Sequence, residues 1–192
     1  MDRIRRRDGV PLADHIASVA AALFYERGIN VVGVDLVASR AGVSKRTVYR
    51  HFPSKDELVA AALLHGPFVE FPKDGTPQQR LVGAFDALVA FVAAATYRGC
   101  PYINAAAELT NPNHPARLIV QRQTERRRRW FKRRLDEMGH ENAEMVAEEL
   151  DILFDGALAN ATKRQSRTPA LAARAAAERL IELRPLAQAV PV

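Results

Sequence analysis

The chain has 192 residues, a formal net charge of +6 and a single cysteine, which excludes an internal disulfide. This length can bury a sizeable core, and a lone cysteine is typical of a reducing compartment, so we expect a cytoplasmic protein. The longest apolar runs fall short of the ~20 residues that cross a bilayer, which argues against a membrane protein.

The positive charge is concentrated at the N-terminal end. Residues 1–55 contain 10 Lys and Arg against 5 Asp and Glu, whereas the remaining residues contain 18 against 17. Such an asymmetry favours a polyanionic partner for this end, most often a nucleic acid. The chain opens with a basic arm that could enter a minor groove or lie along phosphates, with a solvated terminus as the alternative. The basic residues of this arm are Arg3, Arg5, Arg6 and Arg7.

Apolar residues recur with a period of 3.6 and no alternating segment occurs, so the sequence predicts an all-α fold. The first helix is predicted from Pro11, which suits a first helical turn, to Gly28, which can end a helix in a left-handed conformation. Leu12, Ile16 and Leu23 are spaced to share one face of this helix and to contribute to a core.

Two short helices are predicted next, near residues 35–41 and 44–51. Counted from Val34, Ala38 is fifth, Gly42 ninth and Val48 fifteenth, which is the arrangement of a helix-turn-helix. Ala38 is small enough for the second short helix to cross over it, and Gly42 can adopt the positive φ of a tight turn. Val48 is expected to hold the second helix against a small core.

The remaining side chains of that second helix must then face outward, where they can donate to phosphates or to base edges in a major groove. The predicted DNA contacts on it are Lys45, Arg46, Thr47, Tyr49, Arg50 and His51. A longer helix is expected after Pro53, where Ser54 and Glu57 have the spacing of a capping box. Lys55 and the free N–H groups of its first turn could hold a phosphate.

The stretch LVASRAGVSKRTVYRHFPSKDELVAAAL resembles the DNA-binding region of TetR/AcrR family transcriptional regulators. The resemblance covers roughly residues 12–62 and joins the helix-turn-helix pattern to the YRHF stretch and the PSKDEL start of the next helix. The segment RGCPYINAAAE is similar to the sixth helix of one subset of the family. Many members have Ser or Thr where this chain has Gly33, so we expect no side-chain phosphate contact at that position.

Further helices are predicted over residues 77–96, 101–110, 115–138, 141–164 and 169–183. The resemblance implies about nine helices in total, with a helix-turn-helix DNA-binding domain over residues 1–55 and a larger helical domain for effector binding and dimerisation over residues 56–192. It also implies a homodimer joined through the last two helices, about 141–164 and 169–183, and packing inside one monomer is the alternative.

A pocket for a small-molecule effector is implied by the same resemblance. Its candidate lining residues are Phe71, Cys100, Asn104, Gln123, Arg127, Trp130 and Phe154. Ordinary core packing is the alternative for Trp130, and a buried inert thiol is the alternative to a redox role for Cys100. The basic stretch RQTERRRRWFKRRLDEM is predicted to spread its charges around a solvated helix, with i,i+4 pairs such as Glu125 with Arg129. A second nucleic-acid site is the alternative for this stretch, although the resemblance implies that this helix lies beside the effector pocket and away from DNA.

The sequence contains no glycine-rich phosphate loop, nucleophile elbow or metal-ligand spacing, so we predict neither an enzyme nor a metal or other cofactor. The resemblance implies a repressor that leaves a palindromic operator in double-stranded DNA when an unidentified small molecule binds. An architectural protein, which would bind DNA by charge and without an effector, is the alternative that the basic stretches favour.

Overall fold

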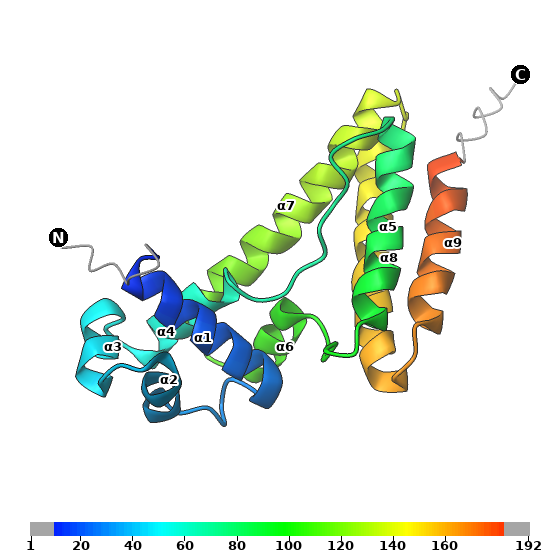
Figure 1. Cartoon of the computed structure of the whole chain (residues 1–192). Coiled ribbons are helices and arrows are strands. Elements are labelled where there is room, and N and C mark those ends of the chain that lie inside the picture. The colour runs from blue at the N-terminus through cyan, green and yellow to red at the C-terminus, as the bar shows by residue number, and fades with distance from the viewer. Residues whose placement is uncertain (1–9, 183–192) are drawn as a thin grey trace, which may run out of the picture. The chain divides into compact units, whose positions relative to one another are not determined.

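A computed structural model describes residues 10–182 of the chain. Within this range the chain forms nine helices and no β-strand, which confirms the predicted all-α class (Figure 1). The described residues divide into two compact units, 10–67 with 101–122 and 68–100 with 123–182, which we call the head unit and the body unit. The predicted functional division at residue 56 stays a prediction, because compactness does not show which residues bind DNA.

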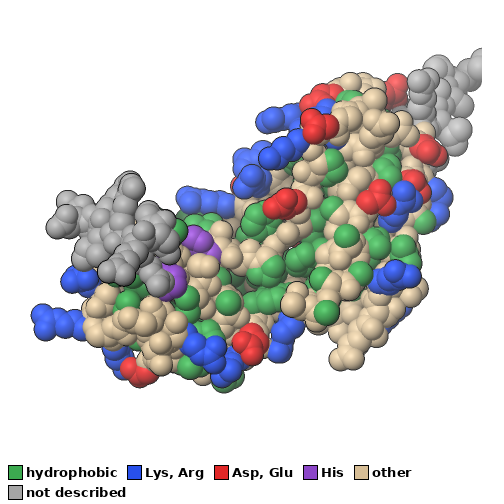
Figure 2. Space-filling view, in the orientation of Figure 1, with side chains coloured by type: hydrophobic (Ala, Val, Ile, Leu, Met, Phe, Trp, Pro, Cys, Tyr) green, Lys and Arg blue, Asp and Glu red, His purple; other side chains and the backbone are tan. Residues whose placement is uncertain are grey.

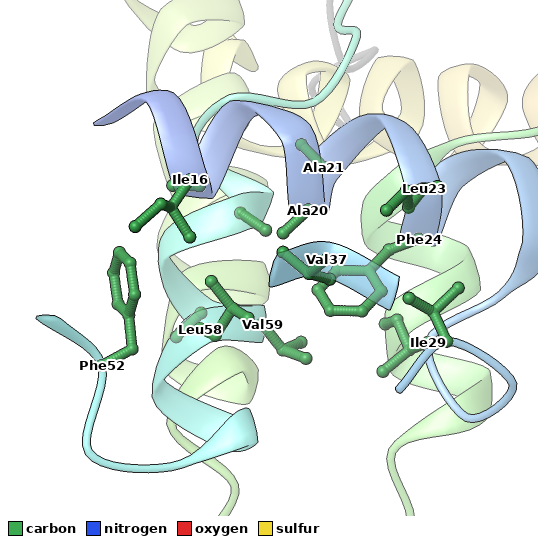
Figure 3. Close-up of a cluster of buried hydrophobic side chains, with 14 of the residues drawn as sticks. Ile16, Ala20, Ala21, Leu23, Phe24, Ile29, Val37, Phe52, Leu58 and Val59 are labelled. Atoms are coloured by element: carbon green, nitrogen blue, oxygen red, sulfur yellow. The ribbon is translucent and has the colours of Figure 1, made fainter. Parts of the chain in front are cut away.

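The head unit contains α1 (Leu12–Arg27), α2 (Val34–Ala41), α3 (Lys45–His51), α4 (Lys55–Leu63), α6 (Pro101–Glu108) and the first turns of α7 (Pro115–Glu137). Side chains from α1, α2 and α4 point toward one another in its core (Figure 3), and Ile16, Val37 and Leu58 among them are fully buried. Burial of each such side chain is worth about 1.5–3 kcal/mol. This packing stabilises α2 and α3, which are too short to be stable alone.

Helix α6 is part of the head unit although it lies far along the chain. The Glu108 carboxylate accepts a hydrogen bond from the Asn30 N–H at 3.1 Å, and the Asn30 amide donates to the Glu108 carbonyl at 3.2 Å. The Tyr102 hydroxyl donates to the carbonyl of Leu63 at 3.3 Å. Ala105 is fully buried in the same core as α1, α2 and α4. The head unit therefore extends well beyond the helix-turn-helix.

The body unit contains α5 (Pro77–Ala93), α8 (Ala143–Arg164), α9 (Thr168–Glu182) and the remainder of α7. A complete capping box begins α5: Thr76 accepts from the N–H of Gln79, and the Gln79 side chain accepts from the N–H of Thr76. An aromatic cluster lies between α7 and α8, where the ring of Phe71 is 4.6 Å from that of Trp130 and 5.7 Å from that of Phe154.

The predicted helix ends lie within three residues of the observed ends. The largest difference is at α5, which ends at Ala93 because the next residue, Ala94, has an extended backbone with ψ 138°. The predicted capping box at α4 is seen in its serine half, since Ser54 accepts from the N–H of Glu57 at 3.1 Å.

Candidate nucleic-acid interface

The turn between α2 and α3 is built as a helix-turn-helix requires. Gly42 ends α2 with a φ of 67°, which is left-handed and favours glycine. The N–H of Val43 donates to the carbonyl of Ala38 at 3.0 Å and closes the turn. Ser44 then caps α3 by accepting from the N–H of Thr47 at 3.1 Å. Ser44, a residue type that disfavours the interior of a helix, thus determines where α3 begins.

Val48 holds α3 in place, since its side chain is only 1% exposed. Lys45, Arg46, Tyr49 and Arg50 are exposed around it. These four predicted contact residues therefore share a solvent-facing surface with donors suited to phosphates and base edges. We refer to them as the α3 surface.

The other two predicted contacts on α3 are less accessible. The Thr47 hydroxyl lies 2.9 Å from the Ser44 hydroxyl, so it takes part in the cap of the helix. His51 is half-buried, and its Nε2 is shielded from solvent without a hydrogen-bond partner. Thr47 and His51 both lie on α3. Their polar atoms are directed toward the protein more than the polar atoms of the α3 surface are.

Asp35 in the first turn of α2 forms an ion pair with Lys45, whose Nζ lies 2.9 Å from its Oδ2. The hydrogen bond that the Lys45 ammonium donates to Asp35 and the negative charge of Asp35 raise the pKa of Lys45 above its ordinary value. Lys45 is thus fully protonated at neutral pH but already has an anionic partner. Asp35 therefore weakens the attraction between Lys45 and an approaching phosphate.

The Asp35→Asn variant is expected to bind non-specific DNA more tightly, because Lys45 then engages a phosphate without losing an ion pair. The slope of log K against log salt should become steeper by about 0.9, the value of one more neutralised phosphate. Fluorescence anisotropy with a labelled random duplex at several salt concentrations measures this. Glu26→Gln, which removes one exposed acid at the end of α1, is the matched control. Equal slopes for both variants would contradict the assigned role of Asp35.

The start of α4 carries mixed charge. Lys55 is half-buried there, and the adjacent Asp56 carboxylate lies 3.4 Å from Nε2 of the buried His114. The His114 Nδ1 accepts the N–H of Ala116 at 3.1 Å, so a neutral ring carries its proton on Nε2, the nitrogen that lies near Asp56. A phosphate at this helix end would meet Lys55 and the free N–H groups, but also a carboxylate.

Gly33 caps α2 through its backbone, without a side-chain hydrogen bond. A Cβ added at Gly33 would meet no atom within 4 Å, so the position has room for a Ser or Thr side chain. The basic arm predicted to contact DNA, with Arg3, Arg5, Arg6 and Arg7, lies outside the described residues.

The predicted effector residues fall into two groups. Phe71, Cys100, Gln123, Arg127, Trp130 and Phe154 belong to the body unit, whereas Asn104 belongs to the head unit. Asn104 lines a head-unit cavity of about 30 Å³ with Tyr25 and Glu108. Pockets for drug-sized ligands usually measure about 300–1,000 Å³. The cavity in this conformation therefore has room only for a water molecule or two.

Arg127 is part of a buried charge cluster in the body unit. Its Nε donates to Asp151 Oδ1 at 2.5 Å, and the two side chains are 11% and 9% exposed. Its Nη2 is 2.9 Å from Asp155 Oδ1, close enough for an ion pair but outside hydrogen-bond geometry. Its guanidinium also lies 4.9 Å from the ring centre of Phe154. Burial raises the pKa of the Asp155 carboxyl.

The sequence analysis did not predict the acidic partners of Lys45 and Arg127. Asp151 and Asp155 are four residues apart on an otherwise apolar helix face, and that spacing was an available signal for a buried cation. Asp35 and Lys45 lie on different helices, so their pairing follows only from the folded turn.

Between residues 10 and 182, no three His, Cys, Asp or Glu side chains are grouped closely enough to hold a metal ion. Over the same range, none of the helices combines the length and the apolar character needed to cross a membrane.

Comparison with known proteins places the helix-turn-helix in a family. The profile described as "Bacterial regulatory proteins, tetR family" matches residues 16–62. Rv1556 of Mycobacterium tuberculosis, an uncharacterized HTH-type transcriptional regulator, is 45% identical over 56 residues, which are 29% of this chain and 28% of Rv1556. FasR of Mycolicibacterium smegmatis, an HTH-type transcriptional activator, is 50% identical over 44 residues, or 23% of this chain and 20% of FasR.

These curated relatives are therefore matched over less than a third of their own length. A solved structure extends the similarity to most of the chain. A TetR-type protein from Streptomyces avermitilis superposes with a TM-score of 0.74 and 27% identity, covering 88% of this chain and 99% of that protein. The helix-turn-helix geometry and the profile match together show that residues 16–62 form a DNA-binding region of the tetR family of bacterial regulatory proteins, and the common fold extends this similarity over most of the chain.

Proposed function

We propose that the protein is a sequence-specific DNA-binding transcriptional regulator, and not an enzyme, that acts in the cytoplasm. The observation that carries this proposal is the α3 surface, where Val48 is buried and Lys45, Arg46, Tyr49 and Arg50 are exposed. A short helix with this division between anchor and donors is suited to a major groove, in which each base pair presents a distinct pattern of donors and acceptors.

The regulator acts as a homodimer on a palindromic operator in double-stranded DNA. Exposed apolar side chains on the last two helices support the dimer: Met145 and Ile152 of α8 are 64% and 63% exposed, and Leu171 of α9 is 44% exposed. Met145, Ile152 and the open Gly156 lie at spacings that share one face of α8. A symmetric dimer predicts two half-sites with centres about 34 Å apart.

A small-molecule effector, without a further cofactor, releases this regulator from its operator as a repressor. Support comes from the family, and in the body unit from the aromatic side chains of Phe71, Trp130 and Phe154 beside the Arg127 cluster. An effector that preferred the DNA-incompetent conformation would weaken DNA binding by that preference alone. Because the relative FasR is named as an activator, transcription from an operator-bearing template is the assay that decides the sign.

Selection of bound duplexes from a random DNA pool, at about physiological salt, tests the proposal. Enrichment of an inverted repeat is expected from a sequence-specific dimer. Retained but unenriched DNA would favour the architectural alternative, in which charge holds DNA without an effector. Failure to retain any DNA would overturn both.

Arg46→Ala is expected to relax the preference at particular base pairs of the selected operator, because Arg46 is exposed near the start of α3. A lost bidentate contact to guanine costs about 1–3 kcal/mol. Binding to a panel of operators with single base changes measures the effect. A uniform loss over the whole panel would instead make Arg46 a phosphate contact.

A further inference from the structure

The basic residues of α7 divide into two groups. Arg127, Arg128, Lys132 and Arg134 form ion pairs with acidic residues of α7 or α8. Arg122, Arg126, Arg129 and Arg133 are exposed, and no ion pair joins them to any residue between 10 and 182. The expected pair of Glu125 with Arg129 is absent from the described residues, and only the unpaired arginines share one side of the helix.

Three of these unpaired arginines, Arg126, Arg129 and Arg133, belong to the body unit and form a single row, which we call the α7 arginine ridge. Their spacings of three and four residues keep them within an arc of about 60° at 100° per residue. With a rise of 1.5 Å per residue the ridge is about 10 Å long. Lys and Arg side chains follow the outer edge of α7 (Figure 2).

The charges of this ridge are not compensated within the described chain. Like charges four residues apart on a helix repel each other and destabilise it. The neighbouring Glu125 is exposed and forms no ion pair that would offset them in the described residues. An external polyanion would remove this repulsion, and the planar guanidinium groups match phosphate in particular because they donate in pairs.

Two other classes of partner suit the ridge less well. A membrane-binding helix needs apolar side chains beside its basic ones, but Trp130 and Phe131 of α7 are packed in the aromatic cluster of the body unit. An acidic peptide is usually held in a groove with side-chain pockets, and a row of arginines on one helix offers none. A DNA backbone requires only regularly placed cations.

We infer that the α7 arginine ridge binds the phosphate backbone of a second DNA segment without reading its sequence. The first segment is the operator on the α3 surface, so the inference takes its partner from the proposed function. It goes beyond that function because it gives the body unit a DNA contact of its own.

The test compares the full-length protein with a ridge variant that carries Arg126→Gln, Arg129→Gln and Arg133→Gln. The control variant carries Lys73→Gln, Arg164→Gln and Arg167→Gln, which removes the same charge from scattered exposed positions of the body unit. The wild-type protein, bound to an immobilised operator, is expected to capture a labelled random duplex. The ridge variant should lose this capture, and its salt slope for random DNA should fall by about 2.7, or 0.9 for each arginine.

The control variant is expected to capture the random duplex and to keep the salt slope of the wild-type protein. Equal losses in both variants would assign the effect to net charge and overturn the inference. Full DNA capture by the ridge variant, with lost retention on polyglutamate, would make an acidic polypeptide the partner and also overturn it. If no operator is enriched from the random DNA pool, the proposed function is wrong. If the ridge variant binds the operator and still captures the random duplex, only the inference about the ridge is wrong.

Discussion

The Arg127→Met variant is expected to lose about 3–5 kcal/mol of unfolding free energy, because it leaves the buried Asp151 carboxylate without its cation. Burial raises the pKa of the neighbouring Asp155 carboxyl and the Arg127 guanidinium lowers it, so without Arg127 this pKa rises further and the folded state binds a proton more readily. The deficit is therefore largest near pH 7 and shrinks as the pH falls toward about 4. Urea unfolding followed by circular dichroism at both pH values measures it.

Two further variants control this result. Arg127→Met combined with Asp151→Leu should recover most of the lost stability, since an apolar pair of similar volume needs no desolvation of charge. Arg128→Met should have little effect, because Arg128 and its partner Glu148 are 43% and 45% exposed. A deficit that is the same at both pH values, or absent, would show that the ion pair does not stabilise α7 against α8.

The Val48→Asp variant is expected to lose DNA binding and on the order of 4 kcal/mol of head-unit stability, because it places an unpaired carboxyl group in an apolar core. Trp130 is the single tryptophan of the chain and lies in the body unit. Its fluorescence should therefore stay native while operator binding, measured by anisotropy, disappears. This combination would separate damage to the head from global unfolding.

Val31→Asp is the matched control, because Val31 is 79% exposed and the same change there should cost no more than about 0.5 kcal/mol. If Val48→Asp bound the operator as tightly as the wild-type protein, Val48 could not be the anchor of α3.

The helix-turn-helix could be predicted in detail from the sequence because its signals are local. The spacing of Ala38, Gly42 and Val48 follows from how two short helices cross at a tight turn, and each residue has the predicted backbone or burial. Ser44 and Ser54 cap helices for reasons that depend only on the next three residues. Such features are fixed by neighbours along the chain.

The pairing of charges could not be predicted because it depends on distant residues. Asp35 reaches Lys45 only after the turn has formed, and Arg127 points inward while Arg126 and Arg129 remain exposed. In a run of consecutive arginines the sequence does not show which of them face α8. The position of Asn104 in the head unit depends on α6 packing against α1 and α4, which no local pattern indicates.

The inclusion of α6 in the head unit has a consequence for protein engineering. A chimera would join the helix-turn-helix of this chain to the helical body of another protein. A cut after residue 67 would remove Ala105, Leu109 and Ala116 from the head core, where all three are buried. A transplantable head is therefore discontinuous, and a functional chimera must carry residues 101–122 together with the N-terminal segment.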